Sequence, residues 1–92
     1  MVTFTYTVGD ENGIHARPAG ALAVCAKKYD SDIKIFKLAD GGDTEREADA
    51  KRLLSVMGLG ARHGDKLRFI VDGADESDAA QALEKCCYEY IG

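Results

Sequence analysis

His15 and Arg17 are the residues of this 92-residue chain best suited to do chemistry. A histidine that is neutral at one ring nitrogen is a nucleophile, and ordinary histidines are largely neutral near pH 7. The guanidinium of an arginine binds phosphate oxygens in a planar fork. The pair therefore indicates a histidine that accepts a phosphoryl group next to a cation that stabilises it.

The elements expected around this pair favour a phosphate site. His15 lies between a glycine-bearing loop and a helix expected over 16–28, in which apolar residues recur at helical spacing. The first N–H groups of a helix have no partner within the helix and carry partial positive charge, so they bind anions. A phosphate on His15 would meet the N–H groups of Ala16 and Arg17. Pro18 suits the first turn, where a missing N–H costs little.

The remaining pattern predicts a small α+β fold. Strands are expected where apolar and polar residues alternate, and helices where apolar residues recur every three to four positions. The expected strands cover 2–8, 33–38, 44–48 and 66–71, and the expected helices cover 16–28, 51–57 and 76–90. This order, β-α-β-β-α-β-α, suggests an antiparallel or mixed sheet with helices on one face, in one domain over 1–92.

Two local signals in the middle of the chain shape this prediction. The segment 44–48, Thr-Glu-Arg-Glu-Ala, has poor strand propensity, and we expect it to follow a hairpin loop over 39–43. Asp49 is a good N-cap residue, and we expect it to begin the short helix that ends near Met57.

Composition and charge limit the expected partners and location. The formal net charge is −4, from 16 acidic and 12 basic residues, so we expect no nucleic-acid partner. No apolar run approaches the roughly 18 residues of a membrane span. The three cysteines are odd in number and two are adjacent, which favours reduced thiols on helices and a cytoplasmic location. No spacing typical of metal ligands occurs, and no cofactor is expected.

A second histidine offers a weaker hypothesis. Arg62-His63-Gly64 has the spelling of the phosphohistidine motif of histidine phosphatases and phosphoglycerate mutases. Those enzymes place the motif after an N-terminal strand of a much larger α/β domain, whereas here it lies in the turn before a later strand. We therefore expect His63 to be a surface residue and the chain not to be a free-standing enzyme.

The chain resembles the HPr family, the histidine-containing phosphocarriers of the bacterial sugar phosphotransferase system. The run Gly13-Ile14-His15-Ala16-Arg17-Pro18-Ala19 matches the phosphorylation motif of that family. The segment 51–60 is similar to its second helix and Leu-Gly end, and 73–76 resembles the turn into its last helix. The resemblance implies an open-faced β-sandwich, in which a four-stranded antiparallel sheet carries three helices on one face.

The resemblance also implies roles for individual residues. His15 would be phosphorylated at Nδ1 by phosphorylated Enzyme I and would pass the group to IIA-type acceptors, with Arg17 assisting and Asn12 as a polar helper. An apolar patch beside the histidine would dock these partners, and its members here would be Gly20, Leu53, Leu54 and Met57. We expect the carrier to be a monomer.

Two departures from the family pattern keep an alternative open. Arg52 stands where many members from low-GC Gram-positive bacteria carry a regulatory serine, and Ser55, one turn later, is not the matching residue. The hairpin over 39–46 is several residues longer than usual for the family. The alternative is an HPr-like regulatory binding module, or a member of a specialised phosphorelay that does not serve sugar transport.

Overall fold

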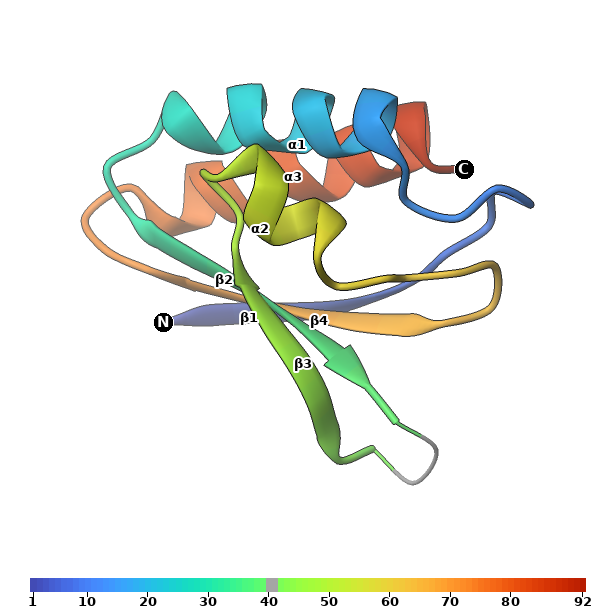
Figure 1. Ribbon diagram of the computed structural model, residues 1–92. Helices are drawn as coiled ribbons and strands as arrows, with labels where there is room; N and C mark the ends of the chain where they lie inside the picture. The colour runs from blue at the N-terminus through green and yellow to red at the C-terminus, as the bar shows by residue number, and fades with distance from the viewer. Residues whose placement is uncertain (40–41) are drawn as a thin grey trace.

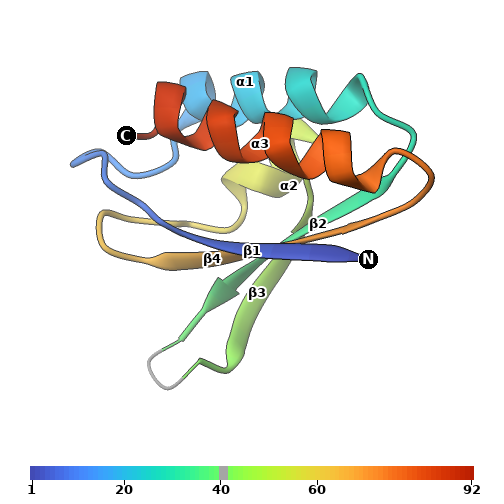
Figure 2. The same ribbon diagram turned by 180° about the vertical axis from the view of Figure 1, so that it is seen from behind.

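The computed structural model of the protein describes residues 1–39 and 42–92. The described residues form, in chain order, β1 (Val2–Thr7), α1 (Ala16–Lys27), β2 (Asp32–Leu38), β3 (Thr44–Asp49), α2 (Leu53–Met57), β4 (Lys66–Asp72) and α3 (Glu76–Tyr90). The predicted order of elements is confirmed. Figures 1 and 2 show the resulting two layers, with the helices over one face of the sheet and the other face uncovered.

The sheet is antiparallel throughout its described part, with the strand order β1-β4-β2-β3. Its two central strands bury alternate side chains, as a half-covered strand does. Phe69 of β4 lies between Phe4 of β1 and Ile35 of β2, and its ring stacks on that of Phe4 with centroids 4.6 Å apart. The buried side chains under the helices include Tyr6, Ile33, Ile35, Leu67, Phe69 and Val71.

The long helices α1 and α3 lie side by side on the sheet (Figures 1 and 2). The apolar side chains that recur along α1 face the core, as predicted; they are Ala19, Leu22, Ala23 and Ala26. Because three of the four are alanines, the helix can approach its neighbours closely. On α3 the buried residues are Ala79, Ala80, Leu83, Cys86 and Cys87. The N-terminus of α1 and the last turn of α3 therefore meet at one end of the molecule.

The weak strand predicted over 44–48 is present as the edge strand β3. Among the described strands it pairs only with β2, and of its own side chains only Ala48 is buried. Its charged residues therefore project into solvent and discourage further pairing. The backbone N–H of Ala39 donates to the carbonyl of Asp43 at 2.7 Å, and this hydrogen bond joins the two sides of the hairpin between β2 and β3. Residues 40–41 of the predicted loop lie outside the described part.

The prediction that Asp49 caps the second helix is wrong. Asp49 is the last residue of β3, paired with Lys34 of β2. Its carboxylate accepts a hydrogen bond from the N–H of Lys51 at 3.0 Å, which is a local Asx turn rather than a helix cap. The helix begins only at Leu53, with Arg52 at the N-cap position.

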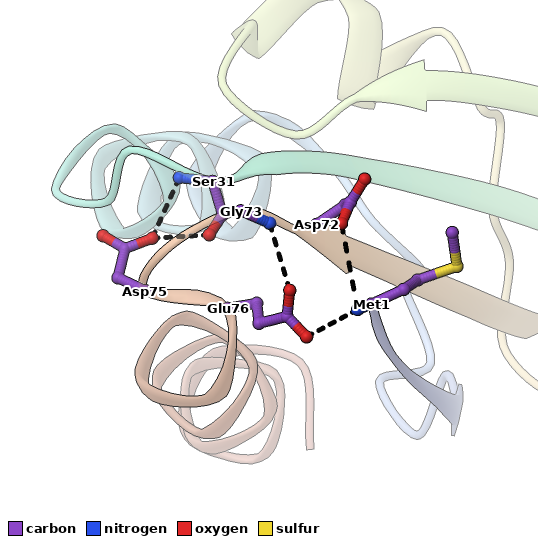
Figure 3. Close-up of polar contacts among 6 residues, drawn as sticks. All are labelled: Met1, Ser31, Asp72, Gly73, Asp75 and Glu76. Carbon is purple, nitrogen blue, oxygen red and sulfur yellow. Dashed lines mark hydrogen bonds and ion pairs between the residues drawn. The ribbon is translucent and has the colours of Figure 1, made fainter.

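A network of hydrogen bonds closes the end of the molecule opposite the start of α1 (Figure 3). The Asp75 carboxylate accepts hydrogen bonds from the N–H of Asp30 at 2.8 Å, the N–H of Ser31 at 2.9 Å and the Ser31 hydroxyl. The backbone of Gly73 lies so close to Ser31 that a Cβ on residue 73 would be 2.7 Å from the Ser31 Cα and hydroxyl oxygen. The Met1 ammonium binds Glu76 at 2.6 Å. These contacts tie the start of β2 to the turn between β4 and α3.

Candidate functional site

His15 is held in place by the two residues before it. Gly13 has a φ of +69°, and a Cβ there would lie 2.4 Å from the carbonyl oxygen of Ala61, so the close approach and the left-handed backbone both require glycine. The N–H of Ile14 donates to that same carbonyl at 3.0 Å, and its side chain is buried. The loop is thereby docked on the segment before β4, and His15 follows as an exposed residue.

The imidazole of His15 makes no hydrogen bond that caps α1. His15 is the N-cap residue of α1, with extended backbone angles and no hydrogen bond from its side chain to the helix. Its carbonyl accepts the first helical hydrogen bond, from the N–H of Ala19 at 3.0 Å. Ala16 and Arg17 are the first two helical residues, so their N–H groups have no acceptor one turn earlier. Pro18 comes next and is buried, which fixes the first turn.

The surroundings of His15 include residues that the sequence motif did not indicate. A shallow depression is lined by Asp10, His15, Arg17, Pro18, Glu89 and Tyr90. Glu89 and Tyr90 belong to the last turn of α3 and reach the site only because α3 packs beside α1. The site therefore combines one guanidinium with two carboxylates.

Asn12, predicted as a helper, does not line this depression. It is exposed in the turn before His15, and its backbone N–H donates to Asp10 Oδ1 at 2.8 Å. Asp10 also accepts a hydrogen bond at its carbonyl from the N–H of Gly13, at 3.0 Å. The side chain that this turn brings beside the histidine is thus Asp10.

The residues predicted for the apolar patch lie on the outer side of α2 and on α1. In the five-residue helix α2 only Val56 is buried, and the three predicted side chains are exposed by 40% (Leu53), 80% (Leu54) and 38% (Met57). Gly20 lies on α1, which packs beside α2, and a Cβ placed on it would meet no atom within 4 Å. Packing does not require a glycine there, and Gly20 lines the groove between α1 and α3.

Arg52, which stands at the regulatory position, and Ser55, one turn later, differ in their contacts. Arg52 is exposed. The Ser55 hydroxyl is partly buried and accepts a hydrogen bond from the N–H of Asp49 at 3.0 Å, which ties α2 to the end of β3. A phosphate on Ser55 would have to break this contact.

The segment around His63 is an ordinary turn. The N–H of Arg62 donates to the Asp65 carboxylate at 2.8 Å, and the N–H of Gly64 donates to the carbonyl of Val8 at 2.8 Å. His63 is exposed in this turn, as expected. Among the described residues no group of three or more His, Cys, Asp or Glu side chains could hold a metal ion.

Comparison with known proteins decides the family. A family model described as the PTS HPr component phosphorylation site matches residues 2–88. The chain belongs to the HPr family. The HPr phosphocarrier of Mycoplasma genitalium is 40% identical over 86 residues, which is 94% of this chain and 92% of that protein.

The family also occurs within longer proteins. A multiphosphoryl transfer protein of Vibrio cholerae is 37% identical over 81 residues, which is 88% of this chain but only 20% of that protein. This chain thus spans about a fifth of that relative and nearly all of the HPr from Mycoplasma genitalium.

Solved structures confirm the HPr fold. The histidine-containing phosphocarrier protein of a Mycoplasma superposes with a TM-score of 0.88 at 29% identity, covering 98% of both chains. An HPr from Thermoanaerobacter tengcongensis gives a TM-score of 0.83 at 28% identity, covering 100% of this chain and 97% of the other. The predicted open-faced sandwich is therefore confirmed. Within the part of the HPr-family chain that is described, no helix has the length and apolar character needed to cross a membrane.

Proposed function

We propose that His15 accepts a phosphoryl group from phosphorylated Enzyme I and passes it to a IIA-type acceptor. The observation that supports this most directly is an exposed imidazole, free of any capping bond, at the start of α1 and beside Arg17. The lone pair of neutral Nδ1 attacks phosphorus, a new N–P bond forms, and the bond from phosphorus to the donor breaks. The second transfer reverses these roles, with His15 as the leaving group.

The surroundings of His15 suit a phosphate that must be released again. The N–H groups of Ala16 and Arg17 and the Arg17 guanidinium stabilise the phosphate oxygens. The carboxylates of Asp10 and Glu89 line the same depression, and their negative charges repel the phosphate and weaken its binding. Because the depression is shallow, the docked partner supplies the remaining stabilisation of the transition state.

Partners would dock on the apolar patch of Gly20, Leu53, Leu54 and Met57. Exposed apolar side chains gathered on one short helix are typical of an interaction surface. We infer a monomeric carrier that acts in the cytoplasm and has no nucleic-acid partner, in line with its negative net charge and free cysteines.

The test is phosphorylation with purified components. With Enzyme I and phosphoenolpyruvate, the chain is expected to gain one phosphoryl group that acid removes, and His15→Ala abolishes the gain. The matched control is His63→Ala, which changes the other exposed histidine and leaves the gain intact. Absence of the gain, or a gain that survives His15→Ala, contradicts the proposal.

A regulatory binding module, or a relay that does not serve sugar transport, is the second candidate. Arg52 cannot accept the phosphate that a serine would, and this removes one route of control known in the family. The phosphorylated chain separates the two candidates. Rapid transfer to a sugar-specific IIA protein favours the carrier, and its absence despite normal phosphorylation favours the alternative.

A further inference from the structure

Two of the three cysteines face each other across the groove between α1 and α3. Cys25 of α1 and Cys86 of α3 both line this groove, together with Gly20, Val24, Lys28 and Glu89. Both thiols line this one groove, and each shifts the pKa of the other, which places the two sulfur atoms near each other. Cys87, one residue further along α3, is fully buried in the core beneath the helices instead.

We propose that Cys25 and Cys86 form a reversible disulfide that joins α1 to α3. The oxidant is hydrogen peroxide or another small peroxide. The Cys25 thiolate attacks one peroxide oxygen, the O–O bond breaks, and a sulfenic acid and hydroxide are formed. The Cys86 thiol then attacks the oxidised sulfur, an S–S bond forms, and the hydroxyl leaves as water with the thiol proton.

The surroundings of the two thiols assign these roles. Cys25 is partly exposed, so a small oxidant can reach it, whereas Cys86 is only 6% exposed. Burial raises the pKa of Cys25, but the nearby Lys28 and Cys86 act in the opposite direction. Burial and the neighbouring Cys25 together raise the pKa of Cys86 to about 11. Cys25 therefore ionises first and attacks, and Cys86 resolves the intermediate.

The groove that would be cross-linked leads to the phosphoryl-acceptor site. Glu89 and Tyr90 line both the groove and the depression that contains His15. A disulfide between Cys25 and Cys86 would fix the last turn of α3 against α1, one turn before these two residues. Formation of this disulfide depends on the two thiols alone and does not require that His15 carries a phosphoryl group.

The test counts thiols in the intact, fully reduced chain after exposure to hydrogen peroxide. We expect the free thiols to fall from three to one without formation of a dimer, and dithiothreitol to restore all three. Because the link closes a long loop, the oxidised chain should melt roughly 10 °C higher than the reduced chain. Peptide mapping of the Cys87→Ala variant should show the Cys25–Cys86 link without ambiguity from the adjacent cysteine.

Serine variants provide the controls. Cys25→Ser and Cys86→Ser should each abolish the intramolecular link, whereas Cys87→Ala should retain it. If Cys87→Ala does not fold, mapping of the wild-type chain with fragmentation between residues 86 and 87 gives the same information. A thiol count that stays at three, a link through Cys87, or a link between two chains overturns the proposal.

Discussion

At the scale of single residues, the charges around His15 would set how firmly a phosphate on it is held. One guanidinium and two helix N–H groups would attract that phosphate, while the carboxylates of Asp10 and Glu89 line the same depression. A carrier has to release its phosphoryl group to the next protein, so an arrangement with several arginines would hold it too tightly. The two carboxylates are therefore expected to raise the transfer potential of the phosphorylated histidine.

Removal of the Glu89 charge tests this balance. In Glu89→Gln the phosphorylated form loses repulsion from one carboxylate, and we expect the equilibrium with phosphorylated Enzyme I to shift about threefold toward the phosphorylated chain. The shift should shrink in high salt, because the site is open to solvent. The distribution of phosphate between the two proteins at equilibrium is the measurement.

Glu84→Gln is the matched control for this prediction. Glu84 lies on the same helix but faces β1 and away from His15, beside Val2 and Phe4. An equal shift in both variants would show only the change in net charge, and no shift in Glu89→Gln at low salt would contradict the prediction.

The sequence indicated half of this site. His15, Ala16, Arg17 and Pro18 are consecutive, so their local pattern was enough to predict an anion site at a helix start. Glu89 and Tyr90 lie more than seventy positions away and reach the site only through the packing of α3 on α1. No local pattern carries that information.

At the scale of elements, α2 is the helix whose start the sequence misplaced. Asp49 has the side chain of an N-cap, but β3 extends through it and its carboxylate closes an Asx turn, so local capping preference yields to sheet pairing. Contacts from β3 then hold the middle of α2 and its C-terminal end. The N–H of Asp49 donates to Ser55, and Arg46 donates to the carbonyl of Gly58 at 3.0 Å, where a cation suits a helix C-terminus.

The outward side of α2 gives a prediction about docking. Leu54 is 80% exposed, so Leu54→Ala should change the thermal midpoint very little. If the patch docks Enzyme I, the variant should raise the KM for phosphoryl transfer by roughly tenfold while leaving kcat nearly unchanged. Steady-state phosphorylation by Enzyme I over a range of chain concentrations measures both constants.

The control for this prediction is Tyr88→Ala, which truncates an apolar side chain that is 63% exposed on α3. Tyr88 packs edge-on against Tyr6 and so lies on a different surface from α2. The docking role is contradicted if Leu54→Ala leaves KM unchanged, or if the two variants raise it equally.

At the scale of the whole molecule, the two ends differ in how far their polar groups are tied up in hydrogen bonds. The end that carries His15 is an open surface with exposed apolar and charged groups. At the opposite end the Asp75 carboxylate accepts hydrogen bonds from Ser31, drawn in Figure 3, and from the N–H of Asp30. The order of elements and the covered face of the sheet followed from periodicity in the sequence. The Asp75 contacts did not, because they join residues more than forty positions apart.

The Asp75 contacts predict how stability depends on pH. The hydrogen bond from the Ser31 hydroxyl, followed by that from the Asp30 N–H, lowers the pKa of the Asp75 carboxyl in the folded chain. A carboxyl whose pKa is lower in the folded than in the unfolded state contributes stability above its unfolded pKa, near 4, and loses that contribution as the pH falls through its folded pKa.

Asp75→Asn should therefore lower the thermal midpoint at pH 7, and the difference from wild type should narrow as the pH falls from about 5 to below 3. Thermal melts followed by circular dichroism across this range test the idea, with Asp32→Asn, an exposed carboxylate at the start of β2, as the control. The Asp75 contacts do not act as described if the difference is the same at pH 7 and pH 3, or if Asp32→Asn reproduces it.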